Sequence, residues 1–154
     1  MSDRSGAFPS VESVLPHRPP FLFLDRILEC TQERVVGART FRPDEPLLGG
    51  HFPGRPVVPA VVLLEALGQA MAYHSLLHHP SREILLVGVD HARFRRLAEL
   101  GVEVCFEVQV GERRAGLTRG EGEVTIAEIQ IARATLLGYS ADPSSPNPII
   151  GGTS

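Results

Sequence analysis

The chain has 154 residues, of which 43% are hydrophobic and 21% charged, and its net charge is −3. These values are typical of one globular domain with a sizeable core, and the negative balance argues against nucleic acid as the main partner. All fifteen basic residues are arginine. Schiff-base chemistry and a P-loop phosphate site both need a lysine, so both are excluded.

The N-terminal residues and the cysteines indicate a reducing compartment. Residues 1–6 are polar and lack the apolar core of a signal peptide. Cys30 and Cys105 lie far apart in strand-like segments, so we predict that both are free thiols. We therefore expect a cytoplasmic protein.

The first third of the chain predicts short elements separated by prolines. The expected elements are a flexible leader over residues 1–10, a helical turn over 11–15, a strand over 21–30, a turn over 31–33 and a strand over 34–42. Pro16 ends the helical turn, and Pro43 and Pro46 end the second strand, because proline lacks the amide donor that both structures need.

The stretch from residue 50 to residue 69 joins a rigid loop to an apolar helix. Three glycines free the backbone and three prolines restrict it between residues 49 and 59. Pro59 suits a first helical turn, and strong helix formers follow from Ala60, so we predict a helix that ends near residue 78. The helix is apolar on nearly all sides, as buried helices are, and its uninterrupted apolar run is too short to span a membrane. Glu65 and Gln69 lie four residues apart and therefore share one face.

After this helix the pattern is that of strands. Residues 102–110 alternate apolar and polar side chains, which is the period of a half-buried strand. The predicted strands are 84–89, 102–110, 117–126 and 128–139, with turns at 112–116 and 127–128, and residues 140–154 form a flexible tail rich in Pro, Ser and Gly.

One long buried helix among about six strands indicates an α+β fold. The physical solution is a curled antiparallel sheet wrapped around the helix, as a single domain over residues 11–139. Such a sheet leaves an open edge, so we expect the chain to dimerise.

Four segments carry a resemblance to a known family. They are Leu15-Pro16-His17-Arg18-Pro19-Pro20-Phe21, Asp25-Arg26, Gly50-His51-Phe52-Pro53-Gly54-Arg55-Pro56 with Glu65 and Gln69, and Val89-Asp90-His91-Ala92-Arg93-Phe94-Arg95-Arg96. Together they resemble the FabZ family of (3R)-hydroxyacyl-[acyl-carrier-protein] dehydratases, which have the hotdog fold. The related FabA branch carries Asp at the position of Glu65.

The resemblance implies a role for each site residue. His51 would be the base that removes the proton α to the thioester, and Glu65 would be the acid that protonates the departing 3-hydroxyl. The other positions that it assigns to substrate binding are Phe52, Gly54, Ala60, Val61 and Gln69. The Ala60 amide would stabilise the charge on the thioester oxygen, in place of a family glycine, and Gln69 would orient the carboxyl.

The resemblance also implies the reaction and the assembly. The product would be a trans-2-enoyl thioester, in fatty acid, polyketide or specialised lipid synthesis, and neither a cofactor nor a metal is implied. The partner would be an acyl carrier protein that carries the 3-hydroxyacyl chain. His51 and Glu65 of one site would come from different subunits of a homodimer, itself part of a trimer of dimers.

Other interpretations stay open. A hotdog acyl thioesterase would also use an acidic residue near the helix, and Ala60 in place of glycine leaves room for a non-catalytic acyl-binding subunit. His74 and His78 are four residues apart, but no nearby carboxylate or thiolate completes a metal site. Six arginines are either a solvated face or a docking surface for an acidic carrier protein, namely Arg93, Arg95, Arg96, Arg113, Arg114 and Arg119. Those favoured for docking are Arg93, Arg95 and Arg96.

The chain departs from the family pattern at several positions. His91 stands where asparagine is common, and Ala127-Glu128 replaces an Asp-Gly hairpin turn. These departures remove no catalytic atom, and they suggest a divergent member of the family.

Overall fold

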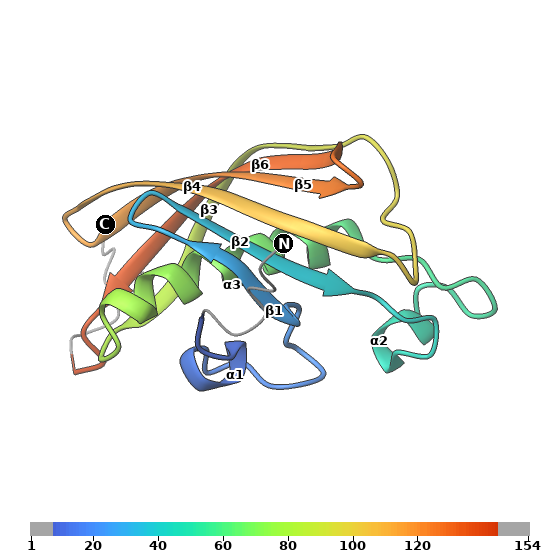
Figure 1. The fold of residues 1–154 in the computed structure, drawn as a ribbon, viewed down its shortest axis with the longest axis horizontal. Helices are drawn as coiled ribbons and strands as arrows, with labels where there is room; N and C mark the ends of the chain where they lie inside the picture. The colour runs from blue at the N-terminus through green and yellow to red at the C-terminus, as the bar shows by residue number, and fades with distance from the viewer. Residues whose placement is uncertain (1–7, 145–154) are drawn as a thin grey trace, which may run out of the picture.

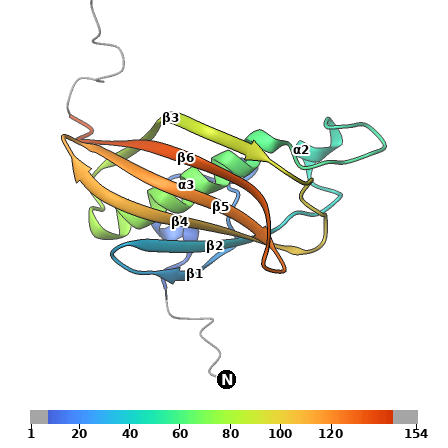
Figure 2. The ribbon, with the colours of Figure 1, turned by 90° about the horizontal axis from the view of Figure 1, so that it is seen from above.

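A six-stranded antiparallel sheet curls around one long helix in the computed structural model, which describes residues 8–144 (Figures 1 and 2). The helices are α1 (Val11–Val14), α2 (Pro46–Gly49) and α3 (Ala60–His78), and the strands are β1 (Arg26–Cys30), β2 (Arg34–Thr40), β3 (Glu83–Phe94), β4 (Glu103–Arg114), β5 (Leu117–Ile126) and β6 (Ile129–Ala141). The strand order is β1-β2-β4-β5-β6-β3. The predicted α+β hotdog architecture is confirmed.

The central helix α3 is the core of the fold. It contacts strands β2 to β6, and the side chains of Ala66, Leu67 and Tyr73 are fully buried. By length and composition α3 is apolar enough to cross a membrane, but 61% of its apolar window is buried inside the fold. Its apolar character is therefore explained by the curled sheet that surrounds it.

The sheet approaches α3 closely because glycines of β5 and β6 face the helix. A Cβ atom on Gly120 would lie 2.7 Å from the sulfur of Met71, and one on Gly122 would lie 2.9 Å from Leu67. Gly138 also faces Met71. No larger residue fits at these distances, so the glycines allow the sheet to wrap tightly around the helix.

The predicted strand over residues 21–30 was wrong in its first half, because β1 begins only at Arg26. Asp25 N donates to Ala38 O of β2 at 2.8 Å, but two backbone groups before it bond to a side chain of α3 and not to a neighbouring strand. Phe23 N donates to Oε1 of Gln69 at 2.8 Å, and Phe21 O accepts from Nε2 of Gln69 at 3.0 Å. These groups are therefore satisfied without a strand partner.

Several predicted boundaries shift by a few residues. Strand β2 ends at Thr40, β3 continues to Phe94, and β4 continues to Arg114, which shortens the predicted turn at 112–116 to two residues. Strand β6 runs to Ala141, into the predicted tail, while residues 1–7 and 145–154 lie outside the described part of the chain. Pro9, in the predicted leader, accepts a hydrogen bond of 2.6 Å from the Tyr73 hydroxyl.

The two-residue turn at Ala127-Glu128 is confirmed. The φ angles of these residues are 47° and 66°, which is the combination of a type I′ hairpin turn. His91 also has a positive φ, 52°, at an irregularity between β3 and β6. The family's common asparagine tolerates this conformation, and histidine is among the residues that share the tolerance.

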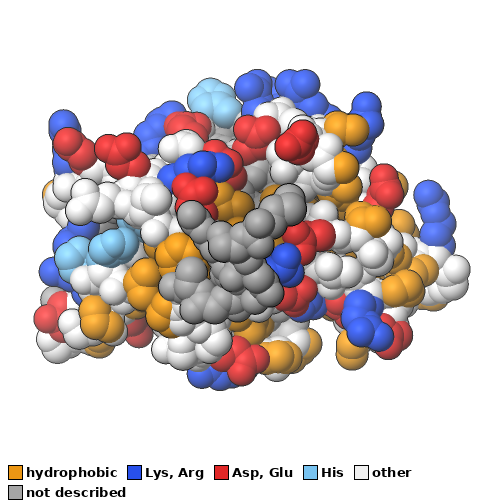
Figure 3. All heavy atoms as spheres, viewed as in Figure 1, with side chains coloured by type: hydrophobic (Ala, Val, Ile, Leu, Met, Phe, Trp, Pro, Cys, Tyr) orange, Lys and Arg blue, Asp and Glu red, His pale blue; other side chains and the backbone are white. Residues whose placement is uncertain are grey.

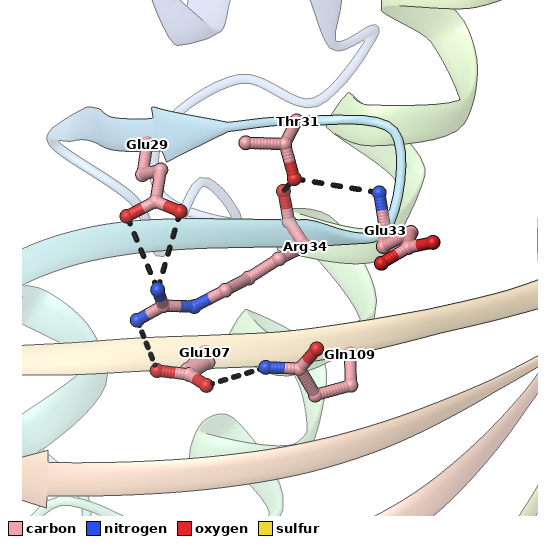
Figure 4. A network of polar contacts seen from close by, with 6 residues as sticks. All are labelled: Glu29, Thr31, Glu33, Arg34, Glu107 and Gln109. Atoms are coloured by element: carbon pink, nitrogen blue, oxygen red, sulfur yellow. Dashed lines mark hydrogen bonds and ion pairs between the residues drawn. The ribbon is translucent and has the colours of Figure 1, made fainter.

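The outer face of the sheet is charged. Figure 3 shows side chains of both signs along the rim where Figure 1 places β4, β5 and β6. Figure 4 shows Arg34 of β2 between two carboxylates, Glu29 of β1 at 3.2 Å and Glu107 of β4 at 2.7 Å, and Gln109 also donates to Glu107. Burial opposes ionisation of Glu107, but the hydrogen bonds from Arg34 and Gln109 outweigh it and lower the pKa of this carboxyl. The face is thus a solvated, ion-paired surface.

Candidate active site

A tight turn holds the loop that carries His51. Phe52 and Arg55 exchange two backbone hydrogen bonds of 2.9 Å, and Gly54 between them has a φ of 75°. Pro53-Gly54 supplies the fixed φ and the positive φ that a type II turn requires. In Figure 1 this loop follows α2 and projects beyond the end of the sheet. Gly54 and Phe52 are both exposed there.

The imidazole of His51 is fixed in one tautomer by the residues after the turn. Its Nδ1 lies 2.9 Å from the carbonyl oxygen of Val57, and Val57 N donates to His51 O at 2.8 Å. The ring also stacks on Phe52, with centroids 4.2 Å apart. A carbonyl oxygen can only accept, so Nδ1 carries the hydrogen and Nε2 of the neutral ring is bare. His51 is thereby prepared to accept a proton at Nε2.

The first turn of α3 offers free backbone donors. Pro59 is the N-cap residue, and no side chain in the described part of the chain caps the helix. Ala60 and Val61 are exposed, Val61 to 69%. The first amides of a helix lack intrahelical acceptors and lie at its positive end, so those of Ala60 and Val61 suit a developing negative charge.

Gln69 orients the carboxyl of Glu65. Its Nε2 donates to Oε1 of Glu65 at 3.0 Å, in addition to the two bonds with Phe21 and Phe23. The amide cannot be reversed, because Phe23 N can only donate and therefore requires Oε1 of Gln69. Since Oε1 of Glu65 accepts this hydrogen, a protonated Glu65 carries its proton on Oε2. Gln69 itself is only 1% exposed, so it positions Glu65 from behind.

Glu65 and Gln69 line a pocket of about 280 Å³ together with His17, Gly68, Met71, Ala72 and residues 84–86 of β3. The Nε2 atom of His17 lies 3.6 Å from Oε1 of Glu65. His51 is not among the residues that line this pocket. One chain therefore brings Glu65, Gln69 and His17 together and holds His51 elsewhere, in the loop before α3. The sequence had given His17 no role, although it lies in the Leu15–Phe21 motif.

Comparison with known proteins shows which family the chain belongs to. A family model described as a FabA-like domain matches residues 15–135. The chain belongs to the FabA-like family. A 3-hydroxyacyl-[acyl-carrier-protein] dehydratase FabZ of Chloroflexus aggregans is 39% identical over 137 residues, which cover 87% of this chain and 95% of the relative. The protein of the same name from Shewanella pealeana is 42% identical over 132 residues, 77% of this chain and 86% of the relative. The resemblance to the FabZ family is thus confirmed.

A solved structure supports the fold of this FabA-like chain. The dehydratase heterocomplex ApeI:P from Xenorhabdus doucetiae matches with a TM-score of 0.76 at 19% identity, over 92% of this chain and 94% of the matched one. At this identity the match shows the shared fold alone.

The arginines favoured for docking lie at the end of β3 and just after it. Arg93, Arg95 and Arg96 are exposed, and none forms an ion pair with a carboxylate within residues 8–144. Both ribbon views place the segment after β3 at the same end of the molecule as the loop of His51 (Figures 1 and 2).

The cysteines and His74, which were also considered as nucleophiles or metal ligands, have surroundings that suit structural roles. Cys30 and Cys105 are free, and burial raises the pKa of both thiols, which makes them poor nucleophiles. His74 Nε2 faces the carbonyl oxygens of Thr31 and Gln32 at 2.9 and 3.0 Å. Within residues 8–144, no three His, Cys, Asp or Glu side chains are grouped to hold a metal.

Replacing Gln69 by methionine tests its anchoring role. Gln69→Met keeps the length of the side chain but leaves the buried N–H of Phe23 without an acceptor, so we expect the free energy of unfolding to fall by about 2 kcal/mol. The dehydration rate should fall as well, because Glu65 loses its orienting donor. Chemical denaturation measures the first effect.

The matched control is Gln109→Met, on the exposed outer face of β4. A surface change of this kind alters stability by about 0.5 kcal/mol or less. Equal stability changes in the two variants would contradict the anchoring role of Gln69.

Proposed function

We propose that this chain removes water from 3-hydroxyacyl thioesters, with His51 as base and Glu65 as acid in a site shared by two subunits. The activity rests on the curated relatives, which are named 3-hydroxyacyl-[acyl-carrier-protein] dehydratases and align over most of both chains. The predicted dehydratase, in fatty acid synthesis, is thus confirmed over the thioesterase alternative. The roles of the individual residues are our proposal, and the bare Nε2 of His51 is the observation that supports them most directly.

The first step is removal of the α-proton. Nε2 of His51 accepts it, and the bond from Nδ1 to the carbonyl oxygen of Val57 stabilises the imidazolium that forms. Negative charge moves onto the thioester oxygen. The amides at the start of α3, near Ala60, would donate to that oxygen.

The second step is loss of the hydroxyl group. Hydroxide is a poor leaving group, so Oε2 of Glu65 gives its proton to the 3-hydroxyl as the C–O bond breaks. The electrons of the former C–H bond form the C=C bond, and water leaves. Gln69 holds Oε1 during this step and so leaves Oε2 directed at the substrate.

A second subunit would complete the site. Strand β3 lies at the edge of the sheet, where its outer backbone groups have no strand partner among residues 8–144, and its apolar side chains Leu86, Val89 and Phe94 are 40%, 36% and 43% exposed. Residues 84–86 of this same edge strand line the pocket of Glu65. A copy paired along β3 would therefore reach this pocket, and we propose that it supplies His51. The trimer of dimers stays a prediction.

The proposed partner is an acidic acyl carrier protein. Its support is the position of Arg93, Arg95 and Arg96, which form no ion pair with a carboxylate among the described residues and lie at the end of the molecule where the His51 loop projects. Positive charge there would attract an acidic protein to the entrance of the site. The cytoplasmic location of the protein also stays a prediction.

We expect His51→Ala and Glu65→Gln each to lower the dehydration rate by about 10²–10⁴-fold, because each removes a proton-transfer group. Enoyl absorbance follows elimination, and a thiol reagent follows hydrolysis. The control variants His79→Ala and Glu99→Gln change exposed residues of the same types and should keep wild-type rates. Near-normal rates in the His51 and Glu65 variants would refute their assignment, and thiol release in place of enoyl formation would favour a thioesterase.

Replacing Arg93, Arg95 and Arg96 by serine should raise KM several-fold for a carrier-linked substrate and leave KM for a small thioester nearly unchanged. Added salt should weaken only the carrier-linked reaction, because it screens exposed charges. The matched control replaces three exposed arginines near the opposite end of the sheet, Arg113, Arg114 and Arg119, with serine. Equal effects of both triple changes, or equal effects on both substrates, would contradict a docking role for the first set.

A further inference from the structure

Gly68 is the one glycine inside α3, and neither the backbone nor the packing of the fold requires it. It lies in regular helix and is not among the residues with a positive φ, so alanine could adopt the same conformation. A Cβ atom at Gly68 would lie 3.7 Å from a methyl carbon of Leu86, an ordinary contact, whereas one at Gly120 or Gly122 would collide with α3. Glycine destabilises a helix interior relative to alanine, so the absence of a side chain at position 68 has another reason.

The missing side chain enlarges the pocket of the proposed acid. Gly68 lies three residues after Glu65, so the two share a face of α3, and both line the pocket. Residues 84–86 of β3 line the same pocket. Apart from the chain neighbours of Gly68 and the backbone of α3, Leu86 is the one described residue within 4 Å of its Cβ position. A methyl group at position 68 would therefore reach from α3 to β3 through space that is now pocket.

The pocket combines a polar group of residues with an apolar one. The polar residues that line it are His17, Glu65 and Gln69, and the others are Gly68, Met71, Ala72, Ile84, Leu85 and Leu86. Along the axis of α3, Gly68 lies about 4.5 Å beyond Glu65, and Ala72 lies about 6 Å further, at 1.5 Å per residue. Gly68 therefore stands between the proposed acid and the apolar part of the pocket.

A 3-hydroxyacyl chain has the same two parts in the same order. Its hydroxyl group would meet Glu65, and its remaining carbons form an apolar chain beyond the carbon that bears the hydroxyl. Burial of that chain against Met71 and Ala72 is favourable, because it removes apolar surface from water. To reach these residues from Glu65, the chain must pass the position of Gly68.

We propose that Gly68 determines acyl-chain specificity by leaving a passage beside Leu86 for the carbons beyond the hydroxyl group. The inference rests on the proposed function, in which Glu65 protonates the 3-hydroxyl. The favoured substrates are 3-hydroxyacyl thioesters whose hydrocarbon chain extends several carbons past the hydroxyl. A methyl group at position 68 would contact Leu86 across the pocket and close the passage to such chains. The helix thus gives up some stability to admit a long substrate.

The two walls of the passage differ in how easily they can move. Position 68 belongs to the backbone of α3, which the sheet holds tightly through Gly120 and Gly122. The wall on β3 is the end of the Leu86 side chain, which is 40% exposed and can change rotamer when a chain enters. A change at position 68 should therefore block the passage, and a shorter side chain at position 86 should open it again.

The test is kcat/KM of Gly68→Ala for a four-carbon and an eight-carbon 3-hydroxyacyl thioester of the same small thiol. The wild type should prefer the eight-carbon substrate by about tenfold or more, since each buried methylene contributes about fourfold. In Gly68→Ala the eight-carbon value should fall about tenfold, as one methyl group in an apolar pocket can cause, and the four-carbon value should stay within about twofold. An equal loss for both substrates, no loss, or a wild-type preference for the short chain would overturn the proposal.

Shortening Leu86 should reverse the effect. The double variant Gly68→Ala/Leu86→Ala should recover eight-carbon activity to within about threefold of Leu86→Ala alone, because the two positions are in direct contact. The matched control combines Gly68→Ala with Val89→Ala, which shortens another exposed residue of β3 that does not line the pocket. Both residues lie on the proposed subunit edge, so the control accounts for any weakening of a dimer. Recovery in both double variants, or in neither, would contradict the passage between Gly68 and Leu86.

Thermal stability separates this role from a packing role. Alanine favours a helix interior over glycine, so Gly68→Ala should raise the melting temperature by about 2–4 °C. A lower melting temperature would show that the fold needs the glycine for packing, and it would refute the inference.

Binding gives a readout that does not depend on turnover. Calorimetry should show that Gly68→Ala binds an unreactive octanoyl thioester about tenfold more weakly than the wild type and binds the butyryl analogue equally well. Equal changes for both ligands would reject the passage. If the octanoyl thioester binds in this way but the wild type forms no enoyl product, the proposed function fails and the passage stands. An active wild type in which Gly68→Ala affects both chain lengths equally rejects only this inference.

Discussion

The position of Glu65, the proposed acid, depends on three hydrogen bonds that the buried side-chain amide of Gln69 forms. Gln69 accepts from Phe23 N, donates to Phe21 O and donates to Glu65. The first two bonds replace strand pairing for the segment that follows the Leu15–Phe21 motif, and the third fixes which oxygen of Glu65 remains free. One side chain thus joins the entry of the chain into the sheet to the chemistry of the pocket. Because Phe23 N can only donate and Phe21 O can only accept, the amide of Gln69 has a single orientation.

Glu65, the proposed acid, and His51, the proposed base, are held in place by different structural elements. Glu65 belongs to a core helix that the sheet wraps closely, since Gly120 and Gly122 leave no room for side chains between sheet and helix. His51 belongs to a projecting loop that is ordered by a tight turn and by Val57. The rigid helix keeps the acid in place, and the projecting loop is free to extend into another subunit along the edge at β3. Because the helix fixes the acid while the loop extends away from it, a site shared between two subunits is physically reasonable.

Sequence reasoning located the elements better than the contacts between them. The helix over residues 60–78, the strand over 117–126 and the turn at 127–128 followed from periodicity and composition, and the four-residue spacing of Glu65 and Gln69 correctly put them on one face. Phe21–Leu24 looked like a strand because its residues are apolar, but the bonding partner of Phe23 N and Phe21 O is Gln69 on α3, 46 and 48 positions away. No local pattern contains such a partner. For the same reason the contact of His17 with Glu65 could be found only in the structure.

In the shared site that we propose, His51 comes from one subunit and Glu65 from the other. The most direct measurement mixes two inactive proteins, His51→Ala and Glu65→Gln, under conditions where subunit exchange is demonstrated by mass spectrometry. In a mixed dimer one site collects both changes and the other collects neither, so we expect about half of the wild-type activity per mixed dimer. If each site were built within one chain, every site would keep one change. Demonstrated exchange without recovered activity would therefore contradict the shared site.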